Sequence, residues 1–270
     1  MKVLLVAATE AEAAVFRRLA LPGAVRDDSF AGNGFSAGCS FSAGRDPSGR
    51  DIRGNLHLSL MVAGIGSTAT AWALTRRLCT GSRPDIVINA GIAGSFRDSL
   101  RTGDVVMPVS DCFADAGVES AEGFLTLSEA GIQDPDAYPF TGDRISAFNS
   151  SGDQHAGPHP FSGERTVVPE SFFKLAAADI RPVKAVTVNT VTGTRETAGR
   201  LMLKYDPDIE TMEGAAFFYV CSRDGIPFIA LRAVSNRVGI RDRGSWNIPL
   251  ALENLVLVLE NLLKNITLKE

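Results

Sequence analysis

The chain has 270 residues, 45% hydrophobic and 21% charged, which is typical of a folded globular protein. Its formal net charge of −4 and isoelectric point near 5.5 argue against a nucleic-acid partner, because phosphate binding needs a basic face. No apolar run approaches the ~20 residues that span a bilayer, and the N-terminal apolar stretch, which stops before Glu10, is too short for a signal peptide. We therefore expect a cytoplasmic protein without a membrane partner.

Apolar runs of strand length alternate with longer amphipathic runs along the chain. The pattern predicts strands over residues 2–8, 55–64, 85–91, 104–110, 183–189 and 227–235. It predicts helices over residues 10–20, 67–78, 169–178, 195–204, 214–223 and 248–264. Such alternation is typical of an α/β fold with helices on both faces of the sheet. We expect a single three-layer αβα domain over residues 1–270, with a mixed, largely parallel central sheet.

Two regions interrupt this alternation. Residues 29–50 are rich in Gly and Ser with interspersed Phe, which favours a hairpin or a flap. Residues 115–165 combine Gly, Pro and acidic residues, and we expect a loop-rich insertion near the site or at an oligomer contact.

The sequence gives no sign of a metal or cofactor site. His155 and His159 are four residues apart, but their Gly- and Pro-rich surroundings are not helical, so the spacing does not place them on one face. The cysteines lack CxxC spacing, and we expect them to be reduced: Cys39, Cys79, Cys112 and Cys221.

The segment "VAGIGSTATA" (62–71) is similar to a dinucleotide fingerprint between a strand and a helix. The acidic residue expected ~20 positions later is missing, because Asp85 opens the next strand and Asn89 ends it. This favours a tight strand-to-helix turn over an NAD site.

A second glycine-rich segment, "NAGIAGS" (89–95), also follows a strand, and the strand over 227–235 runs into Asn236. Ligands of open α/β sheets bind outside the carboxyl ends of the strands, so we expect tight turns at 64–67 and 91–95 to meet Asn236 there. Glycine turns that serve only the chain reversal are the alternative.

Three carboxylates lie at or near this expected edge. Glu10 and Glu12 follow the first strand, whereas Glu213 precedes an apolar helical run in "IETMEGAAFF". A buried carboxylate must meet a hydroxyl, an amide or a cation. A bound sugar diol or a structural partner would satisfy Glu213.

These motifs carry a family resemblance. "EAE", "VAGIG", "VINAGIAGS", "TMEGAA" and "RAVSN" resemble, in order and spacing, the nucleoside phosphorylase and nucleosidase superfamily. "TVNTVTG" and "RAVSNRVGIRDRGSW" are similar to the futalosine hydrolases of the menaquinone pathway, a family near the methylthioadenosine nucleosidases. The resemblance covers residue 1 to about residue 264. It implies a nucleoside-phosphorylase-like fold and no cofactor.

The resemblance also implies residue roles. Glu12 would be the base that activates water, and Glu213 would bind the ribose hydroxyls. Asn236 stands where the methylthioadenosine enzymes have Asp and would face the departing purine. The implied substrate contacts are Thr9, Gly66, Gly91, Ile92, Thr190, Val191, Met212, Arg241 and Arg243.

Asn236 bears on the choice of base. Its NH₂ can donate to O6 of a 6-oxo purine while its carbonyl accepts from N7–H, which favours hypoxanthine. An Asn can also pair with adenine, so the preference stays open. Arg241 or Arg243 would suit the carboxylate that futalosine carries on its 5′ side, and Trp246 could stack on the aryl ring. A surface loop in which Asp242 offsets these arginines is the alternative.

The turn after the first strand, "AATEAEAAVF", has no Arg before Arg17, which suits water activation better than phosphate binding. We expect hydrolysis of futalosine by a homo-oligomer, with hypoxanthine as a product. The alternatives are a methylthioadenosine- or aminofutalosine-type nucleosidase, a purine nucleoside phosphorylase, a nucleoside-binding sensor without turnover, and a dinucleotide-dependent oxidoreductase.

Overall fold

The computed structural model describes residues 1–21, 25–27, 56–121, 123–147, 179–239, 244 and 246–267. The helices in this part of the chain are α1 (Glu10–Phe16), α2 (Ser67–Thr80), α4 (Arg195–Tyr205), α5 (Gly214–Asp224) and α6 (Ile248–Thr267). The strands are β1 (Lys2–Ala7), β2 (Val25–Asp27), β3 (His57–Val62), β4 (Ile86–Ser95), β5 (Val105–Asp111), β6 (Gly117–Ser120), β7 (Gly123–Thr126), β8 (Phe140–Thr141), β9 (Arg144–Ser146), β10 (Arg181–Thr187), β11 (Ile209–Thr211) and β12 (Phe228–Arg237).

The main sheet is mixed and largely parallel, as the sequence predicts. Its strands follow the order β2-β3-β1-β4-β11-β10-β5-β9-β8, and β12 pairs with both β4 and β5. The pairs of β1 with β3 and β4, and of β12 with β4, are parallel. The pairs of β11 with β4 and of β12 with β5 are antiparallel.

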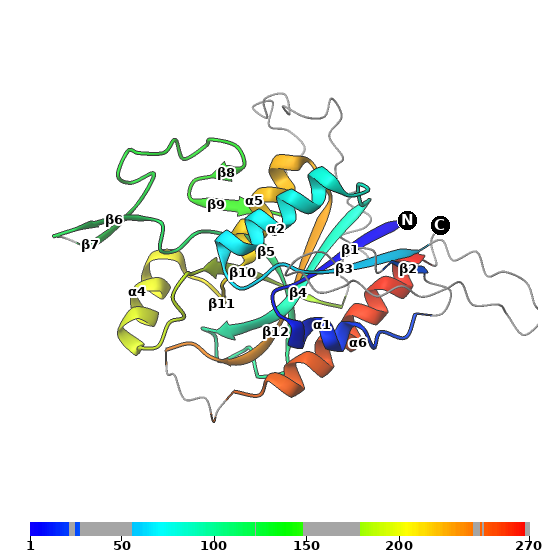
Figure 1. Cartoon of the computed structure of the whole chain (residues 1–270). Coiled ribbons are helices and arrows are strands. Elements are labelled where there is room, and N and C mark those ends of the chain that lie inside the picture. Colours follow the sequence, from blue (N-terminus) through cyan, green and yellow to red (C-terminus); the bar gives the residue numbers. More distant parts are fainter. Residues whose placement is uncertain are drawn as a thin grey trace, which may run out of the picture.

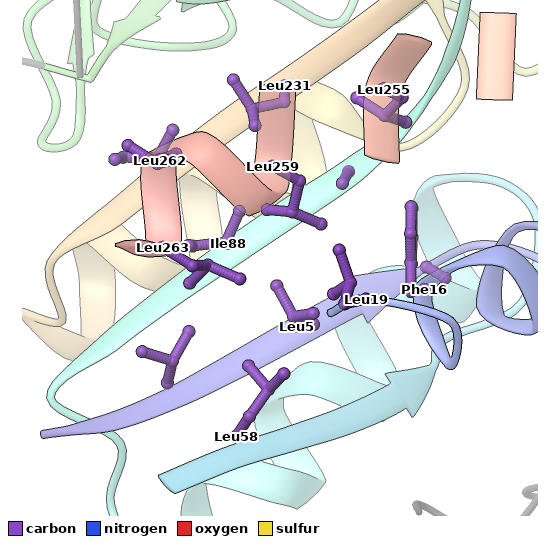
Figure 2. Close-up of a cluster of buried hydrophobic side chains, with 14 of the residues drawn as sticks. Leu5, Phe16, Leu19, Leu58, Ile88, Leu231, Leu255, Leu259, Leu262 and Leu263 are labelled. Atoms are coloured by element: carbon purple, nitrogen blue, oxygen red, sulfur yellow. The ribbon is translucent and has the colours of Figure 1, made fainter. Parts of the chain in front are cut away.

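Helices cover both faces of this sheet. Figure 1 shows α1 and α6 on one side of β1, β4 and β12, and α2 with α5 on the other. The strands supply both cores, because successive side chains point to opposite faces. Leu5 of β1 packs with the α6 leucines (Figure 2), whereas Leu4 packs with Phe217 and Phe218 of α5. The three-layer αβα prediction is confirmed.

One edge of β4 changes its partner along the strand. β12 pairs with β4 along Val87–Ser95 and so occupies one edge. On the other edge β1 pairs only as far as Asn89, and antiparallel β11 begins at Gly94. Between these two strands, residues 90–93 of β4 have no partner on this second edge in the described part of the chain. We call this edge the β4 gap; such switch points are where α/β sheets bind ligands.

Several sequence predictions need correction. The helix predicted over 10–20 ends at Phe16; the apolar spacing continues because Leu19, outside the helix, still packs into the core. The predicted turn at 91–95 is a continuation of β4. The described residues of 115–165 form two hairpins, β6–β7 and β8–β9. The segments 29–50, 148–165 and 169–178 lie outside the described residues.

None of the helices in the described ranges combines the length and apolar character that crossing a membrane requires. The longest, α6, instead buries one apolar face. Leu259 is 0% exposed against the sheet, whereas Leu257 on the same helix is 60% exposed.

This difference gives a matched stability test. We expect Leu259→Ala to lower the free energy of unfolding by about 2–5 kcal/mol, because it removes buried methyl groups and leaves a cavity. Leu257→Ala should change it by less than about 0.5 kcal/mol. Urea unfolding of both variants measures the difference, and equal losses would contradict the packing of α6 described here.

Candidate active site

The β4 gap is occupied by the carboxylate of Glu12. Thr9 is the N-cap of α1, and its hydroxyl accepts from the backbone N–H of Glu12 at 3.2 Å. Glu12 Oε2 in turn accepts from the N–H groups of Ala8 (3.0 Å) and Thr9 (2.9 Å) and from the Thr9 hydroxyl (2.9 Å). This reciprocal pair is a capping box, so local sequence alone aims the carboxylate back toward the end of β1.

The second carboxylate oxygen of Glu12 faces β4. Glu12 Oε1 accepts from the N–H of Ile92 at 3.2 Å, and Glu12 is 6% exposed. A Cβ at Gly91 would lie 2.7 Å from Oε1, so only glycine allows this approach. Gly91 is thus required for close contact within a strand rather than for the turn that the sequence suggested.

Glu213 lies at the start of α5 and contacts the turn that begins α2. Its Oε1 accepts from the N–H of Gly66 at 3.0 Å, and the Ser67 hydroxyl donates to the Met212 carbonyl at 3.3 Å. Burial raises the pKa of Glu213, with hydrogen bonding from Gly66 opposing the rise. Gly64 and Gly66 have φ of 90° and 91°, so the predicted tight turn at 64–67 is present.

Arg232, in the middle of β12, supplies positive charge beneath these carboxylates. It is 1% exposed, and its guanidinium donates to the Asn89 carbonyl (3.0 Å), the Leu231 carbonyl (2.9 Å) and the Asn89 side-chain oxygen. Burial lowers the pKa of Arg232, while the negative charges of Glu213 and Glu12 oppose this shift. The same interactions link Glu12, Glu213 and Arg232 electrostatically.

Asn236 lies farther along β12, opposite Gly94, where the register shifts by one residue at Ser235. The Asn236 Nδ2 donates to the Arg237 carbonyl (3.0 Å), and Oδ1 accepts from the Ser235 hydroxyl (2.8 Å). With respect to the described residues, one N–H and one acceptor lone pair of the amide remain for a ligand. Gly91 and Gly94 are three residues apart, so Asn236 and Glu12 are roughly 10 Å apart along β4.

The structure describes some of the remaining predicted contacts. Thr190 is exposed and Val191 half-buried, two residues beyond the Val188 N–H that donates to the Thr211 carbonyl at 3.0 Å. Arg241 and Arg243 lie outside the described residues. Trp246 is half-buried, and the N–H of Asn247 donates to the Ser235 carbonyl at 3.0 Å, which holds this segment beside the end of β12.

A buried threonine relay holds the start of α5. The N–H groups of Gly214 and Ala215 donate to the hydroxyls of Thr211 (3.2 Å) and Thr187 (2.8 Å). The Thr187 hydroxyl donates its single proton to Asp111 Oδ1 at 3.0 Å. In its 3.1 Å hydrogen bond with the Thr211 hydroxyl, Thr187 is therefore the acceptor and Thr211 the donor. Asp111 is therefore the final acceptor of a chain that fixes the helix directly after Glu213.

Sequence reasoning missed Asp111 and Arg232, among others. Asp111 is 0% exposed, and a Cβ at Gly214 would lie 2.1 Å from its Oδ2, which explains the glycine after Glu213. Asp111 gave no sequence signal, because it ends an ordinary strand. Arg232 did give one: a charge inside an apolar strand is rarely tolerated without partners.

Comparison with known proteins gives the evolutionary context of this arrangement. The profile of the phosphorylase superfamily matches residues 2–267. The chain belongs to the phosphorylase superfamily. A futalosine hydrolase of Streptomyces coelicolor is 32% identical over 73% of this chain and 74% of the relative. A futalosine hydrolase of Acidothermus cellulolyticus is 35% identical over 76% of this chain and 75% of the relative. With such relatives, this superfamily member is a nucleosidase, an N-glycosyl hydrolase.

Solved structures share the fold at lower identity. A futalosine hydrolase of Helicobacter pylori covers 98% of this chain and 97% of its own, with a TM-score of 0.67 and 16% identity. A 5′-methylthioadenosine/S-adenosylhomocysteine nucleosidase of Neisseria meningitidis was solved with methylthio-immucillin-A. It matches with a TM-score of 0.68 and 20% identity, covering 97% of this chain and 98% of its own. The nucleoside-phosphorylase-like fold is confirmed.

The buried position of Asp111 predicts a measurable pH dependence. Burial raises the pKa of Asp111 to about 7, against the opposing effect of Arg144. Between pH 4 and 7 the unfolded chain has lost this proton and the folded chain retains it, so the free energy of unfolding falls as pH rises. This change in the free energy of unfolding amounts to as much as ~4 kcal/mol across the window, and we expect Asp111→Asn to remove it.

Chemical denaturation at several pH values between 4 and 8 measures the effect as the difference between wild type and Asp111→Asn. Asp136→Asn is the control for losing one carboxylate, since Asp136 is exposed. If the Asp111→Asn difference stays constant with pH, Asp111 does not titrate as its burial requires.

Proposed function

We propose that the chain hydrolyses the N-ribosidic bond of futalosine and releases hypoxanthine, a step of menaquinone biosynthesis. The support comes from relatives at 32% and 35% identity, which are futalosine hydrolases. Nucleosidase chemistry needs an activated water, a group that holds the ribose and a group that accepts the departing purine. Glu12 contacts Ile92 in the β4 gap, Glu213 contacts the turn at Gly66, and Asn236 lies opposite Gly94 at the end of the gap.

One observation favours water over phosphate as the nucleophile. Free N–H groups at the turn between a strand and a helix form an anion site. Here the N–H groups of Ala8 and Thr9 already donate to Glu12 Oε2, so a carboxylate occupies the position of an anion. A phosphate would meet this negative charge, whereas a water molecule can donate its proton to Glu12 Oε1. Hydrolysis therefore fits the site better than phosphorolysis.

Bond cleavage creates positive charge on the ribose and negative charge on the purine. Glu12 and Glu213 supply negative charge around the sugar, and Glu213 also accepts from the ribose hydroxyls in this proposal. Arg232 keeps these two carboxylates together by offsetting their repulsion beneath the sugar. Such preorganised charge lowers the barrier most where it faces charge that develops during the reaction.

Asn236 completes the site at the purine. Its free N–H donates to O6 and its carbonyl accepts from N7–H as hypoxanthine leaves. Thr190 and Val191 supply backbone near the base, and Met212 lies beside the ribose. Arg241 or Arg243 binds the aryl carboxylate of futalosine, and Trp246 stacks on the aryl ring. We further propose that the enzyme acts as a cytoplasmic homo-oligomer.

Release of free base tests this function directly. Futalosine, aminofutalosine, inosine and methylthioadenosine are each incubated with the enzyme, with and without phosphate. We expect phosphate-independent release of hypoxanthine from futalosine. Dependence on phosphate would instead identify a phosphorylase, and preference for methylthioadenosine would identify that class of nucleosidase. Binding without release from any of the four would favour a nucleoside sensor.

Glu12→Gln separates catalysis from binding. We expect kcat to fall roughly 10²- to 10⁴-fold, because an amide cannot accept the proton of water, while nucleoside binding measured by calorimetry persists. A glutamine still supports the capping box, so the fold should survive. Glu10→Gln is the matched control on the same helix, where the Glu10 side chain is 53% exposed. A wild-type rate for Glu12→Gln would exclude Glu12 as the base.

A further inference from the structure

Glu210 of β11 is a buried carboxylate for which the mechanism above has no use. It is 6% exposed, and its Oε1 accepts from the N–H of Thr192 at 3.0 Å. Thr192 directly follows Val191, so this bond anchors the backbone segment that borders the purine in the proposed function. A single backbone bond uses only one of the two carboxylate oxygens.

The other oxygen of Glu210 is unsatisfied. Neither Glu210 Oε2 nor the hydroxyl of Thr192 has a hydrogen-bond partner among the described residues, although both atoms are buried. Burial raises the pKa of Glu210; the nearby Thr192 side chain and the Thr192 N–H oppose that rise, although the hydroxyl does not reach hydrogen-bonding geometry with Oε2. An unsatisfied buried carboxylate oxygen is costly, and such groups in native proteins mark sites that serve another purpose.

The position of Glu210 in the sheet indicates that purpose. Glu210 and Asn236 are both paired with Gly94, one from each edge of β4. A Cβ at Gly94 would lie 3.3 Å from Asn236 Nδ2, so the Asn236 side chain is on the face to which residue 94 points. Paired residues share a face, which puts Glu210 on the same face. Two polar side chains thus flank a half-buried glycine at the end of the β4 gap.

We propose that Glu210 is a specificity-determining residue whose Oε2 accepts a hydrogen bond from N1–H of a 6-oxo purine. The inference rests on the proposed function, because it assumes that the base binds at Asn236. N7 and O6 then face Asn236, and N1, which is next to O6 on the ring, faces Glu210 across Gly94. Val238, whose Cγ2 lies over Gly94 on the same face, provides an apolar surface for the ring.

This arrangement distinguishes bases that Asn236 alone cannot. An Asn pairs with adenine as well as with hypoxanthine. Hypoxanthine carries a hydrogen at N1, whereas adenine presents a lone pair there, which would face the lone pairs of Glu210. A site built around such a donor rejects analogues that lack it more strongly than an apolar pocket rejects a change of size.

Glu210→Gln tests the proposal while keeping the anchor. The glutamine carbonyl still accepts from the Thr192 N–H, but the NH₂ that replaces Oε2 donates and cannot accept. We expect kcat/KM for futalosine to fall roughly 10- to 100-fold, whereas aminofutalosine falls less or rises, since its N1 accepts from the new NH₂. Glu196→Gln, an exposed carboxylate on α4, is the matched control and should leave the ratio unchanged.

A second measurement does not depend on turnover. Binding of hypoxanthine, 1-methylhypoxanthine and adenine is compared by calorimetry for wild type and Glu210→Gln. Wild type should prefer hypoxanthine over its N1-methyl derivative, and the variant should lose that preference. If wild type fails to cleave futalosine but shows this pattern, the proposed function is wrong and the role of Glu210 stands. An equal loss for both substrates, or unchanged base preference in the variant, would show that Glu210 only anchors Thr192.

Discussion

The arrangement of the site depends on one buried cation. Arg232 lies in a strand that packs on both faces, with 1% of its surface exposed, and its burial must be offset by hydrogen bonds and negative charge. Asn89 of β4 supplies the hydrogen bonds from the neighbouring strand. Glu12 and Glu213 supply the charge, although they lie two hundred positions apart in the chain. The positive charge of Arg232 thereby offsets the repulsion between these two carboxylates.

The glycines of β4 explain how backbone and carboxylate come so close. At Gly91 a side chain would collide with Glu12, and at Gly94 with Val238 and Asn236. The strand therefore remains regular, while Gly91 and Gly94 leave its two opposite faces without a side chain at these positions. A turn would give the same glycine pattern in the sequence, so the pattern alone does not distinguish a turn from a strand. The difference is set by β12, which pairs with β4 as far as Ser95 and keeps it extended.

Much of the fold follows from local signals. The apolar spacing locates the longer strands and the helices because both periodicities arise from burying one face. The Thr9–Glu12 capping box is also visible in four consecutive residues. The three-residue strand β11 is not, because its pairing with β4 and β10 comes from distant parts of the chain. Glu210 was missed for that reason: nothing in "DPDIET" indicates which residue it will face.

Glu12 shows that a structural and a catalytic interpretation of one residue need not compete. As part of the capping box it orders the first turn of α1, and three donors saturate its Oε2. Those same donors fix the carboxylate so that Oε1 is presented at the β4 gap, where it accepts from the Ile92 N–H. A base held this firmly loses little entropy when it meets its water. The local sequence that starts the helix thus also aims the base and removes the anion site that a phosphate would need.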